Sequence, residues 1–128
     1  GKPLTIYGDG LQVRDALFAD DVAELYIMEL ENIDEHKGKV YNVGGGAKNT
    51  VSIKEAMELI NILDQGENEP FEVSYQPWRH ADHKVYISNI GKISKYWKPK
   101  TTVFNGFSQT YQWIKENKDL IRRFYDVV

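Results

Sequence analysis

The spacing of hydrophobic residues along this chain is typical of strands in some segments and of helices in others. Short apolar runs bounded by glycine, proline or polar residues predict strands at residues 4–7, 39–43 and 71–75. Helical spacing of apolar residues predicts helices over residues 21–33, 52–63, 88–97, 104–114 and 120–125. Strands mixed with helices predict an α/β fold, a small mixed domain in which helices cover one face of a small sheet.

Capping boxes predict where two of these helices begin. Asp21-Val22-Ala23-Glu24 and Ser52-Ile53-Lys54-Glu55 each place a capping side chain three residues before a glutamate. The first helix is predicted to bury an apolar face made of Val22, Leu25, Tyr26, Leu30 and Ile33. The second is predicted to bury Ile53, Ala56, Met57, Ile60 and Leu63.

Composition narrows the class of protein. The 128 residues are 41% hydrophobic and 12% aromatic, enough for one domain with a core, and no apolar run is long enough for a membrane span. A net charge of -3 provides no basic field for nucleic acid. We therefore expect neither nucleic-acid nor membrane partners. With no cysteine, the chain has no disulfide or thiolate chemistry, so we expect a cytoplasmic protein.

Two arginines stand out as candidate ligand contacts. Arg14 follows the glycine turn of Gly8-Asp9-Gly10, which lets the backbone pass close to a ligand, and Arg79 follows the third predicted strand. A guanidinium is a planar, permanently charged fork suited to phosphate. The alternative is an ordinary surface ion pair for each, Arg14 with Asp15 and Arg79 with Asp82.

Several other motifs predict no chemistry. Gly44-Gly45-Gly46 lacks the third glycine of a dinucleotide fingerprint and predicts a simple turn. Tyr96 and Lys100 form a Tyr-x-x-x-Lys motif interrupted by Pro99, and the motif at Tyr111 lies on an apolar helix face. We predict no catalytic residue. The histidines have no metal-ligand spacing, so no metal site is expected either.

Four segments together resemble the extended short-chain dehydrogenase/reductase family of nucleotide-sugar epimerases and dehydratases. They are GDGLQVRD at residues 8–15, YNVGGG at 41–46, Arg79-His80-Ala81-Asp82, and Tyr86-Ile87-Ser88-Asn89. The resemblance runs from about Lys2 to Glu116. It implies that residues 1–128 form the carboxy-terminal, substrate-binding domain of an extended Rossmann-type enzyme, and that the amino-terminal NAD-binding Rossmann domain is absent from this chain.

The resemblance also implies a site. Gln12, Arg14, Arg79 and Asp82 are expected to bind the nucleotide-sugar substrate, with both arginines on its diphosphate. NAD, bound mainly by the amino-terminal half, would exchange hydride with a sugar carbon in an epimerase that is a homo-oligomer at full length. The alternatives are a 4,6-dehydratase or 4-epimerase of the same family, or a non-catalytic nucleotide-sugar-binding module. Relatives usually carry Pro-Gly where this chain has His80-Ala81.

Overall fold

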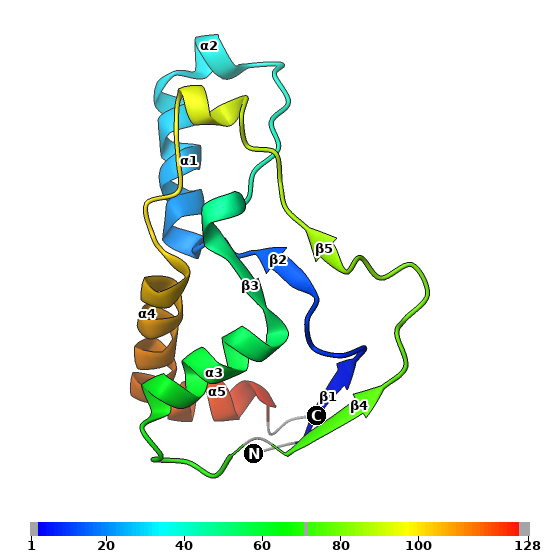
Figure 1. Cartoon of the computed structure of the whole chain (residues 1–128). Coiled ribbons are helices and arrows are strands. Elements are labelled where there is room, and N and C mark those ends of the chain that lie inside the picture. Colours follow the sequence, from blue (N-terminus) through cyan, green and yellow to red (C-terminus); the bar gives the residue numbers. More distant parts are fainter. Residues whose placement is uncertain (1–2, 71, 126–128) are drawn as a thin grey trace.

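The computed structural model describes residues 3–70 and 72–125 (Figure 1). Short strands and helices follow one another, which confirms the mixed α/β fold. None of the helices in this described part is long and apolar enough to cross a membrane. The elements are β1 (Leu4–Tyr7), β2 (Val13–Asp15), α1 (Ala19–Glu31), α2 (Ile33–His36), η1 (Ala47–Asn49), β3 (Thr50–Ser52), α3 (Ile53–Asp64), β4 (Val73–Gln76), β5 (Val85–Tyr86), η2 (Ile93–Lys95), α4 (Val103–Glu116) and α5 (Lys118–Tyr125).

The strands form two small sheets. In one, β1 and β4 are parallel, with Tyr7 opposite Gln76. In the other, β2 lies in the middle, antiparallel to β3 and parallel to β5, with Arg14 opposite Tyr86. Parallel neighbours end at the same edge of a sheet, so the residues that follow β1 and those that follow β4 begin side by side (Figure 1).

The hydrophobic core lies between α1 and η2. Leu25 and Ile93 are fully buried there, and Trp97 is nearly so. Partly buried side chains pack around them, namely Leu17, Met28, Tyr41 and Ile90. The core therefore joins the first long helix to a segment far along the chain, and β2 runs directly into it.

Helix α1 corrects two predictions. It begins at Ala19 after Phe18, with no side-chain cap, so the predicted capping box at Asp21 is wrong. The buried Asp21 carboxylate instead accepts hydrogen bonds from the backbone N–H of Lys100 at 3.3 Å and of Thr101 at 3.0 Å. These long-range donors compete successfully with the local cap, and they tie α1 to the segment before α4.

The buried face of α1 also differs from the prediction. Leu25 is buried as predicted, but Tyr26 and Leu30 are 61% and 69% exposed. Met28 packs on the core in their place. Asp21, Leu25 and Met28 follow each other at helical spacing and form the inner face of α1. The apolar pattern did not predict this face because one of its residues, Asp21, is polar.

Two other predicted elements are absent from the described residues. Residues 39–43 form no strand, and the Val40 carbonyl accepts a hydrogen bond from the Lys92 ammonium at 2.7 Å. Residues 88–97 form only the short η2, although the Ser94 hydroxyl and backbone both bond to the Ile90 carbonyl. In both segments tertiary contacts override local propensity.

The remaining predicted elements are present, and the structure adds the short strands β2, β3 and β5, which were not predicted. The capping box of Ser52 and Glu55 is present at the start of α3. Strand β4 and helices α4 and α5 lie where they were predicted, with ends displaced by a few residues. Phe71, predicted to begin the third strand, lies outside the described residues.

Candidate substrate-binding site

The turn after β1 is built from two glycines in left-handed backbone conformations. Gly8 has φ 91° and Gly10 has φ 79°, and between them Asp9 accepts a hydrogen bond from the Leu11 N–H at 2.9 Å. A Cβ atom on Gly8 would lie only 2.7 Å from the indole ring of Trp78. The space over Gly8 is therefore filled by Trp78, and the expectation that this glycine leaves room for a ligand is wrong.

Arg14 lies on the central strand β2 and contacts the segment after β4. One of its guanidinium nitrogens donates to the Val13 carbonyl at 2.8 Å, and another donates to the Asp82 carboxylate at 2.9 Å. The Arg14 side chain is 43% exposed and that of Asp82 is 23% exposed. The structure thus brings together two of the predicted site residues that are 68 positions apart.

Asp15 makes a different set of contacts, so the alternative of an Arg14–Asp15 pair is wrong. Its carboxylate accepts the backbone N–H of Gly46 at 3.0 Å and that of Ser88 at 3.1 Å. A Cβ on Gly44 would lie 2.2 Å from this same carboxylate. The glycine turn at residues 44–46 therefore packs against β2. Asp15 fills the space that the pyrophosphate of a dinucleotide would need.

Arg79 begins a tight turn that ends at Asp82. The Asp82 N–H donates to the Arg79 carbonyl at 3.3 Å, and Ala81 has the left-handed φ of 63°. The Arg79 guanidinium lies 4.2 Å from the centre of the Tyr7 ring. Arg79 therefore does not pair with Asp82, and the turn carries both site residues at the edge where β1 and β4 end.

Gln12 is the most buried of the four predicted site residues. The residue is 6% exposed, and its amide nitrogen donates to the Tyr7 carbonyl at 2.9 Å. The amide oxygen is buried without a hydrogen-bond partner among residues 3–70 and 72–125. A buried acceptor without a donor costs free energy, so the burial of this oxygen opposes stability at this position.

Three contacts of this site were missed from the sequence. Tyr7 lies under Arg79, Trp78 packs on Gly8, and the Lys84 ammonium lies 5.5 Å from the Trp78 ring. The signal that could have found Tyr7 is the pairing of β1 with β4, since parallel neighbours end at one edge. With two guanidinium groups and an ammonium there, the surface can bind an extended anion such as a diphosphate.

The two Tyr-x-x-x-Lys motifs do not form acid/base pairs. The Tyr111 hydroxyl donates to Asp64 at 2.7 Å, which, with burial, raises the pKa of Tyr111 to about 12. Lys115 is bonded to Glu67 at 2.8 Å and Lys100 to Glu24. A catalytic tyrosine needs a pKa nearer to neutral, so Tyr111 is displaced in the wrong direction.

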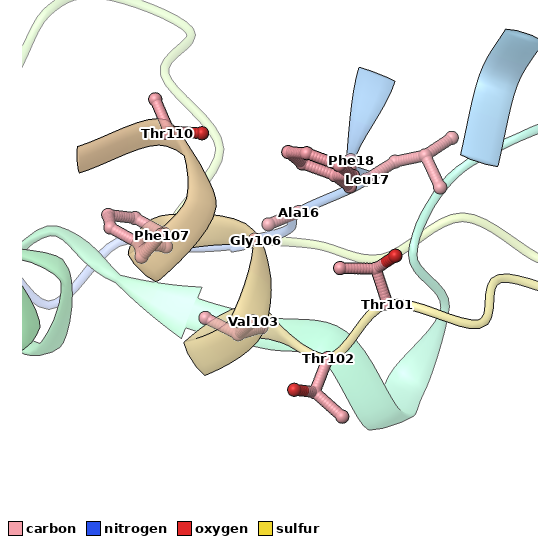
Figure 2. Close-up of a pocket in the computed structure, with 9 residues that line it drawn as sticks. All are labelled: Ala16, Leu17, Phe18, Thr101, Thr102, Val103, Gly106, Phe107 and Thr110. Atoms are coloured by element: carbon pink, nitrogen blue, oxygen red, sulfur yellow. The ribbon is translucent and has the colours of Figure 1, made fainter. Parts of the chain in front are cut away.

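An apolar pocket lies elsewhere on the molecule (Figure 2). Its volume is about 170 Å³, and Figure 2 shows the Phe18 ring pointing towards the first turns of α4. None of its lining residues is charged, and none is a predicted site residue. The pocket therefore does not suit a diphosphate. In the described part of the chain no three His, Asp or Glu residues gather to hold a metal ion.

The sequence of this chain matches those of known proteins. Residues 1–44 match the NAD dependent epimerase/dehydratase family. CDP-paratose 2-epimerase of Salmonella typhi is 35% identical over 114 residues, which are 88% of this chain and 33% of that protein. The resemblance to this family is confirmed. UDP-glucuronate 4-epimerase of Thermodesulfobacterium geofontis is also 35% identical, over 94% of this chain and 36% of its own length.

The fold of these epimerases agrees with that of the chain. The crystal structure of UDP-glucuronic acid 4-epimerase from Bacillus cereus, in complex with UDP-glucuronic acid and NAD, superposes with a TM-score of 0.76 at 27% identity. The superposition covers 90% of this chain and 36% of that one. The chain thus spans about a third of the length of the epimerases that it matches.

Proposed function

We propose that this chain is the substrate-binding portion of an NAD-dependent nucleotide-sugar epimerase, in which Arg14 and Arg79 grip the diphosphate of the substrate. The observation that carries the proposal is the ion pair between Arg14 and Asp82. It holds β2 against the turn that begins with Arg79, so that two segments far apart in sequence lie side by side. Family resemblance assigns both segments to the substrate.

Physical chemistry supports this assignment of roles. Two guanidinium groups can donate charge-assisted hydrogen bonds to two phosphates at once. The diphosphate is remote from the sugar carbon that reacts, so binding energy spent there fixes the position of the sugar. Gln12 donates to the Tyr7 carbonyl and would help to hold the turn between β1 and β2 beside the substrate.

NAD would be held mainly outside these residues. The glycine turn at residues 44–46 is filled by Asp15, Ser88 and Ala16, which leaves no cradle for a pyrophosphate. We therefore propose an amino-terminal Rossmann domain in the whole protein that holds NAD and completes the site. We further propose that the whole enzyme is a cytoplasmic homo-oligomer.

CDP-paratose 2-epimerase is the activity that we propose first. The match to the Salmonella enzyme and the GDGLQVRD and YNVGGGAKNTVS segments support it. A 4-epimerase is the second candidate, because the UDP-glucuronate enzyme matches at the same identity. A 4,6-dehydratase is the third, since dTDP-glucose 4,6-dehydratase of Salmonella typhimurium is 32% identical over 122 residues. A non-catalytic nucleotide-sugar-binding module is the alternative outside enzymes.

Reconstitution tests this proposal. The chain is mixed with a separately expressed Rossmann domain taken from the Salmonella relative, and turnover is measured with CDP-paratose, UDP-glucuronate and dTDP-glucose in turn. We expect NAD-dependent epimerisation of CDP-paratose, and turnover of another substrate alone would select a different member of the family. A well-folded complex that binds nucleotide sugars without turnover would favour the non-catalytic module.

A further inference from the structure

The two arginines of the site are held in different ways. Arg14 is paired with a carboxylate, whereas the guanidinium of Arg79 lies 4.2 Å from the centre of the Tyr7 ring. We propose that Tyr7 is a positioning residue, whose ring holds Arg79 in place for an anionic ligand without neutralising its charge. This inference rests on the proposed role of Arg79 as a diphosphate contact.

The two parallel strands bring Tyr7 and Arg79 together. Tyr7 is the last residue of β1 and lies opposite Gln76, the last residue of β4, so the chain after β4 begins beside the Tyr7 ring. Hydrogen bonds fix the backbone here on both sides. The Gly8 N–H donates to the Gln76 carbonyl at 2.8 Å, and Gln12 donates to the Tyr7 carbonyl at 2.9 Å.

Trp78 fixes the residue immediately before Arg79. Its indole ring occupies the space where a side chain on Gly8 would lie, with ring atoms 2.7 Å from the position of a Cβ. The segment that leads into Arg79 is therefore anchored at Gly8 before it reaches Tyr7. The two aromatic contacts therefore act on neighbouring residues of one short segment, with Trp78 held at Gly8 and the Arg79 guanidinium held at Tyr7.

Contact with a ring keeps a guanidinium available in a way that an ion pair does not. A cation lying over a ring is attracted to the electron-rich face, and the N–H groups of the guanidinium point outward in its own plane. A carboxylate partner occupies some of those donors and offsets part of the charge, as Asp82 does for Arg14, whereas a ring occupies none of them. Among the ion pairs of residues 3–70 and 72–125, none includes Arg79.

A first experiment tests the contact without any ligand. Side-chain NMR of the 128-residue chain compares the Arg79 Nε–H signal in the wild type, Tyr7→Phe and Tyr7→Leu. A ring below the guanidinium shifts this proton upfield, so we expect the shift in the wild type and Tyr7→Phe and its loss in Tyr7→Leu. Tyr75→Leu, which removes a 54% exposed tyrosine from neighbouring β4, is the matched control.

A second experiment tests what the contact does. Titration with CDP compares wild type, Tyr7→Phe, Tyr7→Leu, Arg79→Ala and the double variant Tyr7→Leu/Arg79→Ala. We expect Tyr7→Leu to weaken binding about 2- to 5-fold and Tyr7→Phe to bind like the wild type. Once Arg79 is removed, adding Tyr7→Leu is expected to have no further effect.

The outcomes separate the inference from the proposed function. An Arg79 signal that is the same in the wild type and in Tyr7→Leu overturns the inference, whatever the chain binds. Equal weakening by Tyr7→Leu with and without Arg79 also overturns it. If Arg79→Ala binds CDP like the wild type, the proposed grip fails, while a ring-dependent shift of the Arg79 signal still supports the contact.

Discussion

Ala81 adopts a backbone conformation that favours glycine. Its φ of 63° lies at the centre of the turn from Arg79 to Asp82. A left-handed conformation costs a non-glycine residue about 1–2 kcal/mol, and the extra freedom of glycine in the unfolded chain offsets part of that. We therefore expect Ala81→Gly to raise the free energy of unfolding by about 0.5–1 kcal/mol, measured by urea denaturation.

The matched control at this position is Ala81→Val. A β-branched side chain tolerates the left-handed region least, so this variant is expected to be less stable than the wild type. If Ala81→Gly proved less stable than the wild type, the turn would not have the conformation described here. Glycine is also the residue that the family resemblance places near this position.

Motifs in the sequence predict the candidate site residues, but they do not predict the partners of those residues. Arg14 and Asp82 are both family-like positions, and the alternative to a ligand contact paired Arg14 with Asp15 because the two are adjacent in sequence. Successive residues on a strand point to opposite faces, so Arg14 and Asp15 cannot share one surface once β2 is known. The pattern of apolar residues did not reveal β2, because it is a short strand with two charged residues.

Helices α3 and α4 are joined by a hydrogen bond that depends on pH. The Tyr111 hydroxyl donates to Asp64, which raises the pKa of Tyr111 to about 12 and lowers that of Asp64. The raised pKa contributes stability that is complete below the ordinary value of 10.0 and is lost as pH rises through about 12. The lowered pKa contributes stability that is lost as pH falls below the ordinary value of 3.8.

We therefore expect Tyr111→Phe to be less stable than the wild type near pH 7, and the difference to shrink towards pH 12. Urea denaturation across this pH range measures the difference, and ultraviolet titration of the tyrosines locates the late-titrating phenol. Lys118→Ala, on exposed α5, is a control that leaves this bond intact. A wild type and variant that differ equally at pH 7 and pH 12 would contradict this account.

The turn at residues 44–46 needs glycine because neighbouring atoms pack closely against its backbone. A Cβ on Gly45 would lie 1.9 Å from the Ala16 carbonyl oxygen, which belongs to backbone and cannot move aside. We expect Gly45→Ala to lower the free energy of unfolding by about 3 kcal/mol, the upper part of the range for overpacking. Thermal or urea unfolding followed by circular dichroism measures this loss.

Gly106 provides the matched comparison inside helix α4. Its nearest neighbour to an added Cβ is a Phe18 ring carbon at 3.4 Å, an ordinary contact. Alanine is the better helix former by about 1 kcal/mol, so Gly106→Ala is expected to stabilise the protein slightly. A Gly45→Ala variant as stable as Gly106→Ala would show that the turn is not packed against β2 as described.

Elements were predictable where local signals decide structure. The α3 capping box and the spacing of α4 act within a few residues, and both were predicted correctly. The predictions for residues 39–43 and 88–97 were wrong because the conformation of these segments depends on contacts between distant parts of the chain, such as the hydrogen bond from Lys92 to Val40. Side-chain periodicity carries no information on such long-range contacts.

Many large apolar side chains are exposed in the part of the chain that the structure describes. Ile6, Leu25, Ile93 and Trp97 are the hydrophobic residues that are buried in the described part of the chain. Large side chains such as Leu30, Val40 and Phe124 are at least 69% exposed. Where such side chains lie together, they mark a site of contact with other polypeptide.

We expect the isolated chain to self-associate. Sedimentation velocity should show larger species as concentration rises, and a hydrophobic dye should bind the chain strongly. Adding the Rossmann domain in trans is expected to reduce both signals, while serum albumin as an unrelated protein is expected to change neither. A chain that stays monomeric at high concentration and binds no dye would contradict this prediction.

The central claim is that Arg14 and Arg79 together grip a diphosphate. Isothermal titration of the chain with CDP, compared with cytidine, measures the contribution of the phosphates directly, and Arg14→Ala and Arg79→Ala test each residue. The account predicts that CDP binds more tightly than cytidine, that each variant weakens CDP about 10-fold or more, and that cytidine binding is unchanged. CDP binding that is equal in the wild type and both variants would contradict it.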